Sequence, residues 1–208
     1  ADISQELQEL WQHKHQFLRT EEDETYDVSY QNNAAIYAEF GKIVCISCGF
    51  FNGKEFRLKS FFGDDEKQLL MEFSTLLNST KLYLCGHNIK EFDVPYVCRR
   101  MLVNGIKLPN ALDVAGKKPW EVNFVDTLQL WKFGDYKSYT SLNLLATIFN
   151  IPTPKDDIDG SMVGKVYWQD NDLPRIVQYC QKDVITVVRL LQKWQQQVLL
   201  KDEEVVIV

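Results

Sequence analysis

The chain has 208 residues, of which 45% are hydrophobic and 12% aromatic, and this is enough to bury the core of a single domain. It has no run of about 18 apolar residues and no basic-then-apolar leader, so we expect neither a membrane span nor a signal segment. The net charge of −6 argues against a protein that coats duplex DNA non-specifically. It does not exclude a nuclease, because carboxylates that hold metal ions add negative charge.

The cysteines predict a reducing environment. They are five in number, an odd count, and most lie within apolar runs: Cys45, Cys48, Cys85, Cys98 and Cys180. We interpret them as reduced thiols of a cytoplasmic protein. Cys45 and Cys48 have zinc-like spacing, but they lie in a strand-like run without a second Cys/His pair, so core thiols are the better interpretation.

The first 34 residues are polar and helix-prone, with a partial apolar stripe between Ile3 and Leu18. The acidic run Glu21–Glu24 is interpreted as a solvated helix end or loop. We expect one domain over residues 1–208, comprising a helical segment (1–34), a core (35–200) and a tail (201–208).

A β-hairpin opens the core. Residues 43–51 are apolar and β-rich, Asn52-Gly53 is a strong hairpin signal, and residues 55–62 alternate polar and apolar as a half-buried edge strand does.

Helices and strands then alternate. We expect strands at 82–85 and 122–125, and helices from Asp64, from Asp93, at 128–131, at 141–149 and at 173–199, with a polar, turn-rich stretch at 153–171. This order predicts an α/β architecture with a mixed sheet flanked by helices. The apolar end of the tail, Val205–Val208, either adds an edge strand or pairs with another chain, which leaves a homo-oligomer open.

Two stretches carry residues suited to chemistry. Tyr179 and Asp183 are four apart on the long helix and share a face, so a phenol stands beside a carboxylate that can hold a metal ion. Asn88, Phe92 and Asp93, preceded by His87, lie where a strand gives way to a helix, a place suited to ligand sites. Each stretch also has an ordinary interpretation, since Tyr–Asp pairs are common on helix surfaces and an Asp before a helix is commonly its N-cap.

Taken together, the two stretches resemble the 3′–5′ exonucleases of the DEDD superfamily in its tyrosine branch. The chain is most similar to bacterial proteins related to the proofreading domain of family B DNA polymerases, over roughly residues 36–195. Asn88, Phe92 and Asp93 match the second motif of these proteins, and Tyr179 and Asp183 match the third, Tyr-x-x-x-Asp. Asp126-Thr127 and Asp159-Gly160-Ser161 look like further features found between them. The resemblance implies an RNase H-like fold with an antiparallel hairpin and parallel strands.

One motif of the family is absent. Its first motif is Asp-x-Glu on the first central strand, and no apolar strand ending in Asp-x-Glu precedes the hairpin in this chain. In the family fold this strand lies between the hairpin and residues 82–85, so its absence would leave a gap in the sheet. We expect that the sequence begins after the first motif. The alternative is a genuine loss, with Val205–Val208 or a strand of a partner filling the gap.

The resemblance implies a mechanism if the first motif exists. Asp93 and Asp183 would join its Asp and Glu in holding two Mg²⁺ or Mn²⁺ ions. Tyr179 would orient the attacking water, while His87, Asn88 and Phe92 would contact substrate. The expected substrate is a single-stranded or frayed DNA 3′ end, which would release nucleoside 5′-monophosphates. The alternatives are an RNA exonuclease and a non-catalytic nucleic-acid-binding or interaction module.

Overall fold

The computed structural model describes residues 3–17, 25–79, 82–135, 139–152 and 158–208. In these ranges the strands are β1 (Cys45–Asn52), β2 (Glu55–Phe62), β3 (Cys85–Gly86), β4 (Val125–Asp126) and β5 (Val205–Ile207). The α-helices are α1 (Gln5–His15), α2 (Tyr26–Asn33), α3 (Glu66–Ser79), α4 (Asp93–Val103), α5 (Thr127–Lys132), α6 (Leu142–Ile148), α7 (Val163–Trp168) and α8 (Leu173–Trp194). Four short 3₁₀ helices are η1 (Ala34–Ile36), η2 (Pro119–Glu121), η3 (Gly160–Met162) and η4 (Asp202–Glu204).

The predicted hairpin is present. Strands β1 and β2 pair antiparallel from Cys45 opposite Phe62 to Asn52 opposite Glu55, so Gly53 and Lys54 form the turn. Gly53 has φ 64°, a left-handed conformation that glycine adopts without steric cost. The prediction that β2 is an edge strand was wrong, because the C-terminal strand β5 pairs with its other side.

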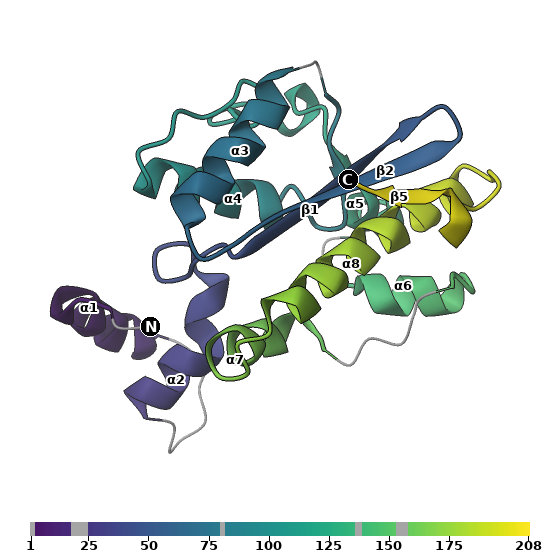
Figure 1. The fold of residues 1–208 in the computed structure, drawn as a ribbon. Coiled ribbons are helices and arrows are strands. Elements are labelled where there is room, and N and C mark those ends of the chain that lie inside the picture. Colours follow the sequence, from purple (N-terminus) through teal and green to yellow (C-terminus); the bar gives the residue numbers. More distant parts are fainter. Residues whose placement is uncertain (1–2, 18–24, 80–81, 136–138, 153–157) are drawn as a thin grey trace.

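The hairpin separates two layers of helices. Helices α3 and α4 lie on one side of β1 and β2, and α8 crosses the other side (Figure 1). Alternation along the strands produces this arrangement, since successive side chains point to opposite faces. Ile46 and Cys48 pack against the core that includes α3 and α4, whereas Cys45 packs with α8. The mixed α/β architecture with a sheet flanked by helices is therefore confirmed.

A buried ion pair joins α3 to α4. The carboxylate of Glu66 accepts hydrogen bonds from Arg100 Nε (2.8 Å) and Nη2 (2.5 Å), from Asn104 Nδ2 (3.0 Å) and from the backbone N–H of Ile43 (2.7 Å). These contacts hold the pKa of Glu66 below its usual value although burial opposes them, and they raise the pKa of Arg100. They connect both helices to the segment that enters β1.

The strands form two separate sheets. Among the described residues, β1 pairs with β2 and β2 with β5, while β3 pairs in parallel only with β4. Strand β3 is also shorter than the predicted 82–85, covering Cys85 and Gly86 alone. The edges of β1 and of β3 that face away from these partners therefore carry no ladder hydrogen bonds in the described chain.

The tail closes the opposite edge of the larger sheet. Residues Val205–Ile207 pair in parallel with Phe56–Leu58, so the tail adds an edge strand and does not lie beside β1. The alternative in which it fills the gap was therefore wrong. Helix α8 ends at Trp194 and not at 199, because Gln196 adopts φ 56° and the chain turns back. Arg189 then holds the returning chain by donating to the carbonyl of Leu200 (2.9 Å).

Outside the central sheet, the structure agrees with the sequence predictions only in part. The first predicted helix is α1, whose Trp11 is buried among the rings of Tyr30, Tyr37 and Phe40. Helix α7 was not predicted, since its stretch reads as polar and turn-rich. The acidic run Glu21–Glu24 and the residues 153–157 lie outside the described ranges. None of the helices in those ranges combines the length and the apolar composition that a membrane crossing requires.

Candidate active site

Tyr179 and Asp183 lie one turn apart on α8, as their spacing predicts. The Tyr179 hydroxyl hydrogen-bonds the Asp183 carboxylate, and burial together with that negative charge raises the pKa of Tyr179. At neutral pH the phenol is therefore protonated, and because a carboxylate only accepts, the hydroxyl donates to it. Tyr179 can position a water molecule but is not a base that removes its proton.

Asp93 is the first residue of α4, and Phe92, not Asp93, is the N-cap. Surrounding protein raises the pKa of Asp93 to about 6, and the negative charge of Asp126 adds to the effect. Part of Asp93 remains open to solvent, so water and ions still reach a carboxyl that is crowded by protein. Carboxyls with raised pKa values in such surroundings are common in active sites, although structural groups show them too.

The two predicted metal-ligand carboxylates both act electrostatically on the Cys180 thiol. The negative charges of Asp183 and Asp93 both contribute to raising the pKa of Cys180, which follows Tyr179 on α8. Residues far apart in the sequence thus act on one thiol of α8.

The loop Asp159-Gly160-Ser161 also approaches this place. A Cβ atom added to Gly160 would lie 3.9 Å from the Tyr179 hydroxyl oxygen, and the charge of Asp159 contributes to the raised pKa of Tyr179. The Asp159 side chain caps η3 by accepting from the Ser161 N–H (2.8 Å). Sequence reasoning noted this loop as a family-like feature but did not place it at the site.

Asp126 organises the loop that leads to Asp93. It is 2% exposed and caps α5 by accepting from the backbone N–H of Leu128 (3.0 Å) and Gln129 (3.4 Å). The same carboxylate accepts from the N–H of Asn88 (2.9 Å) and of Lys90 (3.1 Å). An aspartate between a strand end and a helix commonly makes such a cap. The second role was missed, because no local pattern shows that the loop after β3 lies against the end of β4.

His87 is held on both ring nitrogens. Nε2 lies 2.8 Å from the carbonyl oxygen of Thr140, and Nδ1 lies 2.9 Å from Thr127 Oγ1. A carbonyl only accepts, so Nε2 carries the proton and Nδ1 accepts from the threonine. Burial lowers the pKa of His87, which favours this neutral form. A ring nitrogen of His87 can hydrogen-bond a substrate only by giving up one of these hydrogen bonds.

The other two predicted substrate contacts flank the same loop. Asn88 adopts φ 62°, and its backbone carbonyl accepts from the N–H of Glu91 (3.2 Å) and Phe92 (3.0 Å). The Phe92 ring is 43% exposed and lies 5.7 Å from the ring of Tyr96. It therefore offers an accessible aromatic face one residue before Asp93.

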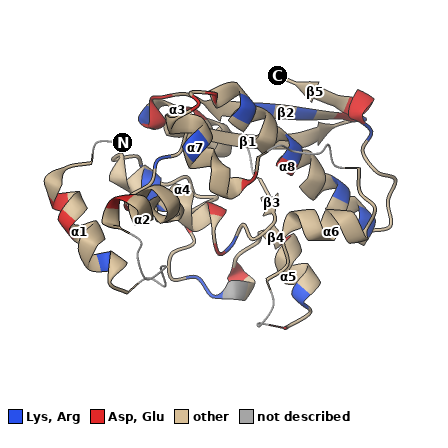
Figure 2. Ribbon diagram, turned by 90° about the horizontal axis from the view of Figure 1, so that it is seen from below, with Lys and Arg blue, Asp and Glu red and all other residues tan. Residues whose placement is uncertain are grey.

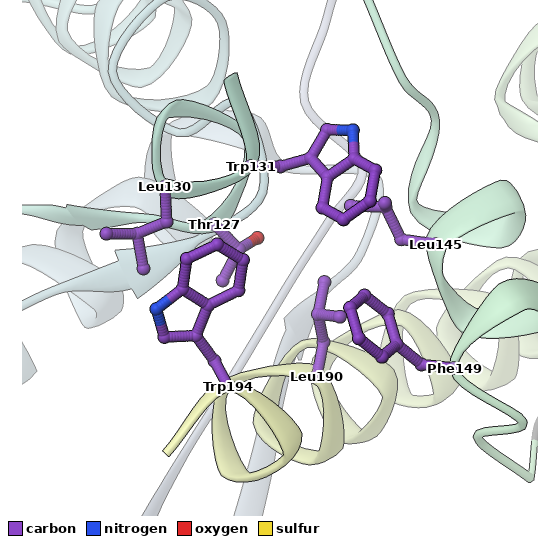
Figure 3. A pocket seen from close by; sticks show the side chains of 7 residues that line it. All are labelled: Thr127, Leu130, Trp131, Leu145, Phe149, Leu190 and Trp194. Atoms are coloured by element: carbon purple, nitrogen blue, oxygen red, sulfur yellow. The ribbon is translucent and has the colours of Figure 1, made fainter. Parts of the chain in front are cut away.

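An apolar pocket lies beyond Thr127. Figure 3 shows side chains at and near α5, α6 and α8 that lie around a narrow pocket, lined by Thr127, Leu130, Trp131, Leu145, Phe149, Leu190 and Trp194. Its lining is almost wholly apolar, and its Trp131 and Phe149 rings meet edge to face. The pocket holds no carboxylate and is separate from the Tyr179–Asp183 pair.

The described residues fit a metal centre only in part. Asp93 and Asp183 offer hard oxygen ligands of the kind that Mg²⁺ and Mn²⁺ prefer. However, in the part of the chain that the structure covers, there is no group of three or more His, Cys, Asp or Glu arranged to hold an ion. Two carboxylates are too few for a two-ion centre, so further ligands are required.

The positive charges are dispersed. Figure 2 shows the Lys and Arg positions spread over separate elements, among them β2, α5, α7 and α8. With a net charge of −6, this pattern is not that of a protein that grips long duplexes through their phosphates.

The structure is thus a mixed α/β domain that carries Asp93 at the start of α4 and the Tyr179–Asp183 pair on α8. The chain belongs to the family described as predicted 3′–5′ exonucleases related to the exonuclease domain of PolB, which it matches over residues 35–199. A comparison with curated proteins gave no match.

Proposed function

We propose that the protein is a metal-dependent 3′–5′ exonuclease with an RNase H-like fold. It would act on single-stranded or frayed DNA ends and release nucleoside 5′-monophosphates. The observation that supports this proposal is the Tyr179–Asp183 pair on α8, together with the carboxylate of Asp93, whose charge acts on the neighbouring Cys180 thiol. Family membership supports the reaction class.

In the proposed reaction, different residues position the water, the terminal nucleotide and the backbone of the site. Tyr179, protonated and hydrogen-bonded to Asp183, orients a water molecule beside the scissile phosphate. Phe92 presents its exposed ring to a terminal base, and Asn88 offers an amide to the same nucleotide. Asp126 holds the intervening backbone through the N–H groups of Asn88 and Lys90.

The proposal requires more carboxylates than the described residues supply. We place them on a further strand between β1 and β3, where both strand edges lack a ladder partner in the described chain. An Asp-x-Glu at the end of that strand would join Asp93 and Asp183 in holding two Mg²⁺ or Mn²⁺ ions. Such ions stabilise the attacking and leaving oxygens of a phosphodiester displacement.

We also propose a cytoplasmic location for the protein. All five cysteines are free thiols in the structure, which is consistent with a reducing, cytoplasmic environment. The partner we propose is a nucleic acid with an accessible 3′ end.

Asp183→Asn in the full-length protein tests the proposal. The assay is Mn²⁺-dependent release of mononucleotides from a 3′-labelled single-stranded DNA oligonucleotide, run beside an RNA of the same sequence. We expect loss of digestion with the thermal unfolding midpoint kept within a few degrees. Asp27→Asn, an exposed aspartate on α2, is the matched control and should digest as the wild type does.

One observation favours a second candidate, a non-catalytic nucleic-acid-binding module. It is the lack of a three-ligand metal group among the described residues. A full-length wild-type protein that binds the oligonucleotide but does not shorten it in Mg²⁺ or Mn²⁺ would establish this second function and reject the first. Digestion of the RNA alone would instead reassign the substrate.

A further inference from the structure

Two thiols from distant parts of the chain meet where α8 crosses the larger sheet. Cys45 begins β1 and Cys180 lies in the first half of α8, and each thiol shifts the pKa of the other, as neighbouring thiols do. Both pack against the same buried cluster, which contains Val44 and Ile176. The helix and the strand therefore bring the two thiols side by side at this cluster.

A row of polar contacts holds the same two elements in register. Ser47, on the same face of β1 as Cys45, lies with its Oγ 2.8 Å from that of Ser60 on β2. Gln181 donates from α8 to Ser60 Oγ (3.0 Å), and Cys45 Sγ lies 3.8 Å from Ser47 Oγ. Two consecutive residues of α8 therefore contact this face of the hairpin: Cys180 packs against it, and Gln181 hydrogen-bonds to it.

We propose that Cys45 and Cys180 form an oxidation site, at which a peroxide converts the two thiols into an intramolecular disulfide.

The chemistry balances in two steps. The Cys45 sulfur attacks hydrogen peroxide, an S–O bond forms as the O–O bond breaks, and the thiol proton leaves in one water molecule. The Cys180 sulfur then attacks the resulting sulfenic acid, an S–S bond forms as the S–O bond breaks, and the second thiol proton leaves in a second water molecule. The two thiols lose two electrons in total, and the peroxide gains them.

The two thiols differ in their pKa values. The neighbouring Cys180 lowers the pKa of Cys45, whereas Cys45 and burial raise the pKa of Cys180. The thiolate is the nucleophile in such reactions, so Cys45 reacts first and Cys180 resolves the intermediate.

The remaining cysteines are placed differently. Cys48 is three residues from Cys45 and points to the opposite face of β1, where burial raises its pKa to about 11. Cys85 is exposed on β3, which is not a strand of the sheet that α8 crosses. Cys98 donates to the carbonyl of Leu112 at 3.5 Å. Cys48 therefore provides a matched control on the same strand.

The bond has a consequence for the candidate active site. Tyr179 immediately precedes Cys180, so a disulfide to β1 would tie that turn of α8 to the sheet. This consequence rests on the proposed function, whereas formation of the bond does not.

Peptide mapping of the full chain tests the proposal. The protein is treated with hydrogen peroxide, blocked with iodoacetamide, digested with trypsin and examined by mass spectrometry. We expect a loss of about 2 Da from the intact mass for one bond. We also expect a linked pair of peptides, residues 43–54 with residues 176–182, that dithiothreitol separates. Fragmentation of this pair assigns the sulfur to Cys45 or to Cys48 in the wild-type protein, so the result does not depend on any variant folding.

The variants sharpen the assignment. Cys45→Ser and Cys180→Ser should abolish the linked pair, and Cys48→Ser should retain it. A wild-type protein in which peroxide leaves these peptides unlinked would overturn the proposal, as would a link carried by Cys48. Because the experiment detects the disulfide bond directly, its result does not depend on whether the protein has exonuclease activity.

Discussion

The buried carboxylate of Asp126 lies 2.9 Å from the backbone nitrogen of Asn88, and this hydrogen bond joins the end of β4 to the loop that follows β3. The second carboxylate oxygen accepts from Lys90 at 3.1 Å. A buried carboxylate therefore fixes the backbone of this loop. The loop carries two predicted substrate contacts and leads to Asp93.

Asp126→Asn should loosen this loop. The new amide still accepts through its oxygen, but its NH₂ group then faces the Lys90 N–H, so one buried donor loses its acceptor. We expect a loss of about 1–3 kcal/mol in the free energy of unfolding. Hydrogen exchange should show faster exchange at the amides of Asn88 and Lys90. Asp113→Asn, at an exposed aspartate, is the control; equal exchange in the two variants would contradict the anchoring role.

Glu66→Gln should destabilise the protein because it leaves the buried guanidinium of Arg100 without its charged partner. We expect a loss of about 3–5 kcal/mol at pH 7, measured by urea unfolding. The folded-state pKa of Glu66 is lowered from 4.5, so its contribution is present above pH 4.5 and is lost as the pH falls below that value. The difference between the two proteins should therefore shrink in acid.

Glu72→Gln, an exposed glutamate on the same helix, should show neither the loss nor the pH dependence. A difference for Glu66→Gln that stays constant from pH 7 to pH 3 would argue against an ionised Glu66.

Asp93→Asn should make the protein more stable at alkaline pH. The folded-state pKa of Asp93 is raised from 3.8 to about 6, so its contribution to stability is present below pH 3.8 and is lost as the pH rises through 6. Asparagine has no ionisable carboxyl, so the variant does not lose this stability as the pH rises. Since Asp93 keeps exposed surface, we expect a gain of only about 1 kcal/mol at pH 8, and none at pH 3.5.

Urea unfolding in chelator-containing buffer measures this gain, with Glu91→Gln, an exposed neighbour, as the control. No gain at pH 8 would show that the Asp93 carboxylate carries no cost in the folded protein.

Tyr179→Phe tests whether the Tyr179 hydroxyl acts in the reaction or only stabilises the fold. The phenylalanine keeps the packing and loses the hydroxyl that hydrogen-bonds Asp183. We expect digestion by the full-length protein to fall about 100-fold, the scale of a misplaced reactant. The free energy of unfolding should change by about 1 kcal/mol.

Tyr30→Phe loses a hydroxyl that donates to the carbonyl of Phe40 at 3.2 Å, away from the site, and serves as the control for digestion. Unchanged digestion by Tyr179→Phe would remove Tyr179 from the reaction.

Local patterns in the sequence determined most of the elements. The alternation of residues 55–62 and the apolar spacing of α3 depend on neighbours a few residues away, and the structure contains both. The Asn-Gly signal predicted the hairpin correctly, but the turn is Gly53-Lys54, one residue later, because Asn52 pairs with Glu55. The four-residue spacing of Tyr179 and Asp183 likewise placed both on one face of α8, because a helix turns once in 3.6 residues.

Only the tertiary structure decided which distant segments meet. Val205–Ile207 read equally well as an edge strand or as a contact to another chain, and packing placed it against β2. The meeting of Cys45 with Cys180, and of Asp126 with Asn88, joins residues that no periodicity relates. Such pairs depend on how whole helices and strands bury their apolar faces against one another, a property of the assembled core that short sequence patterns do not encode.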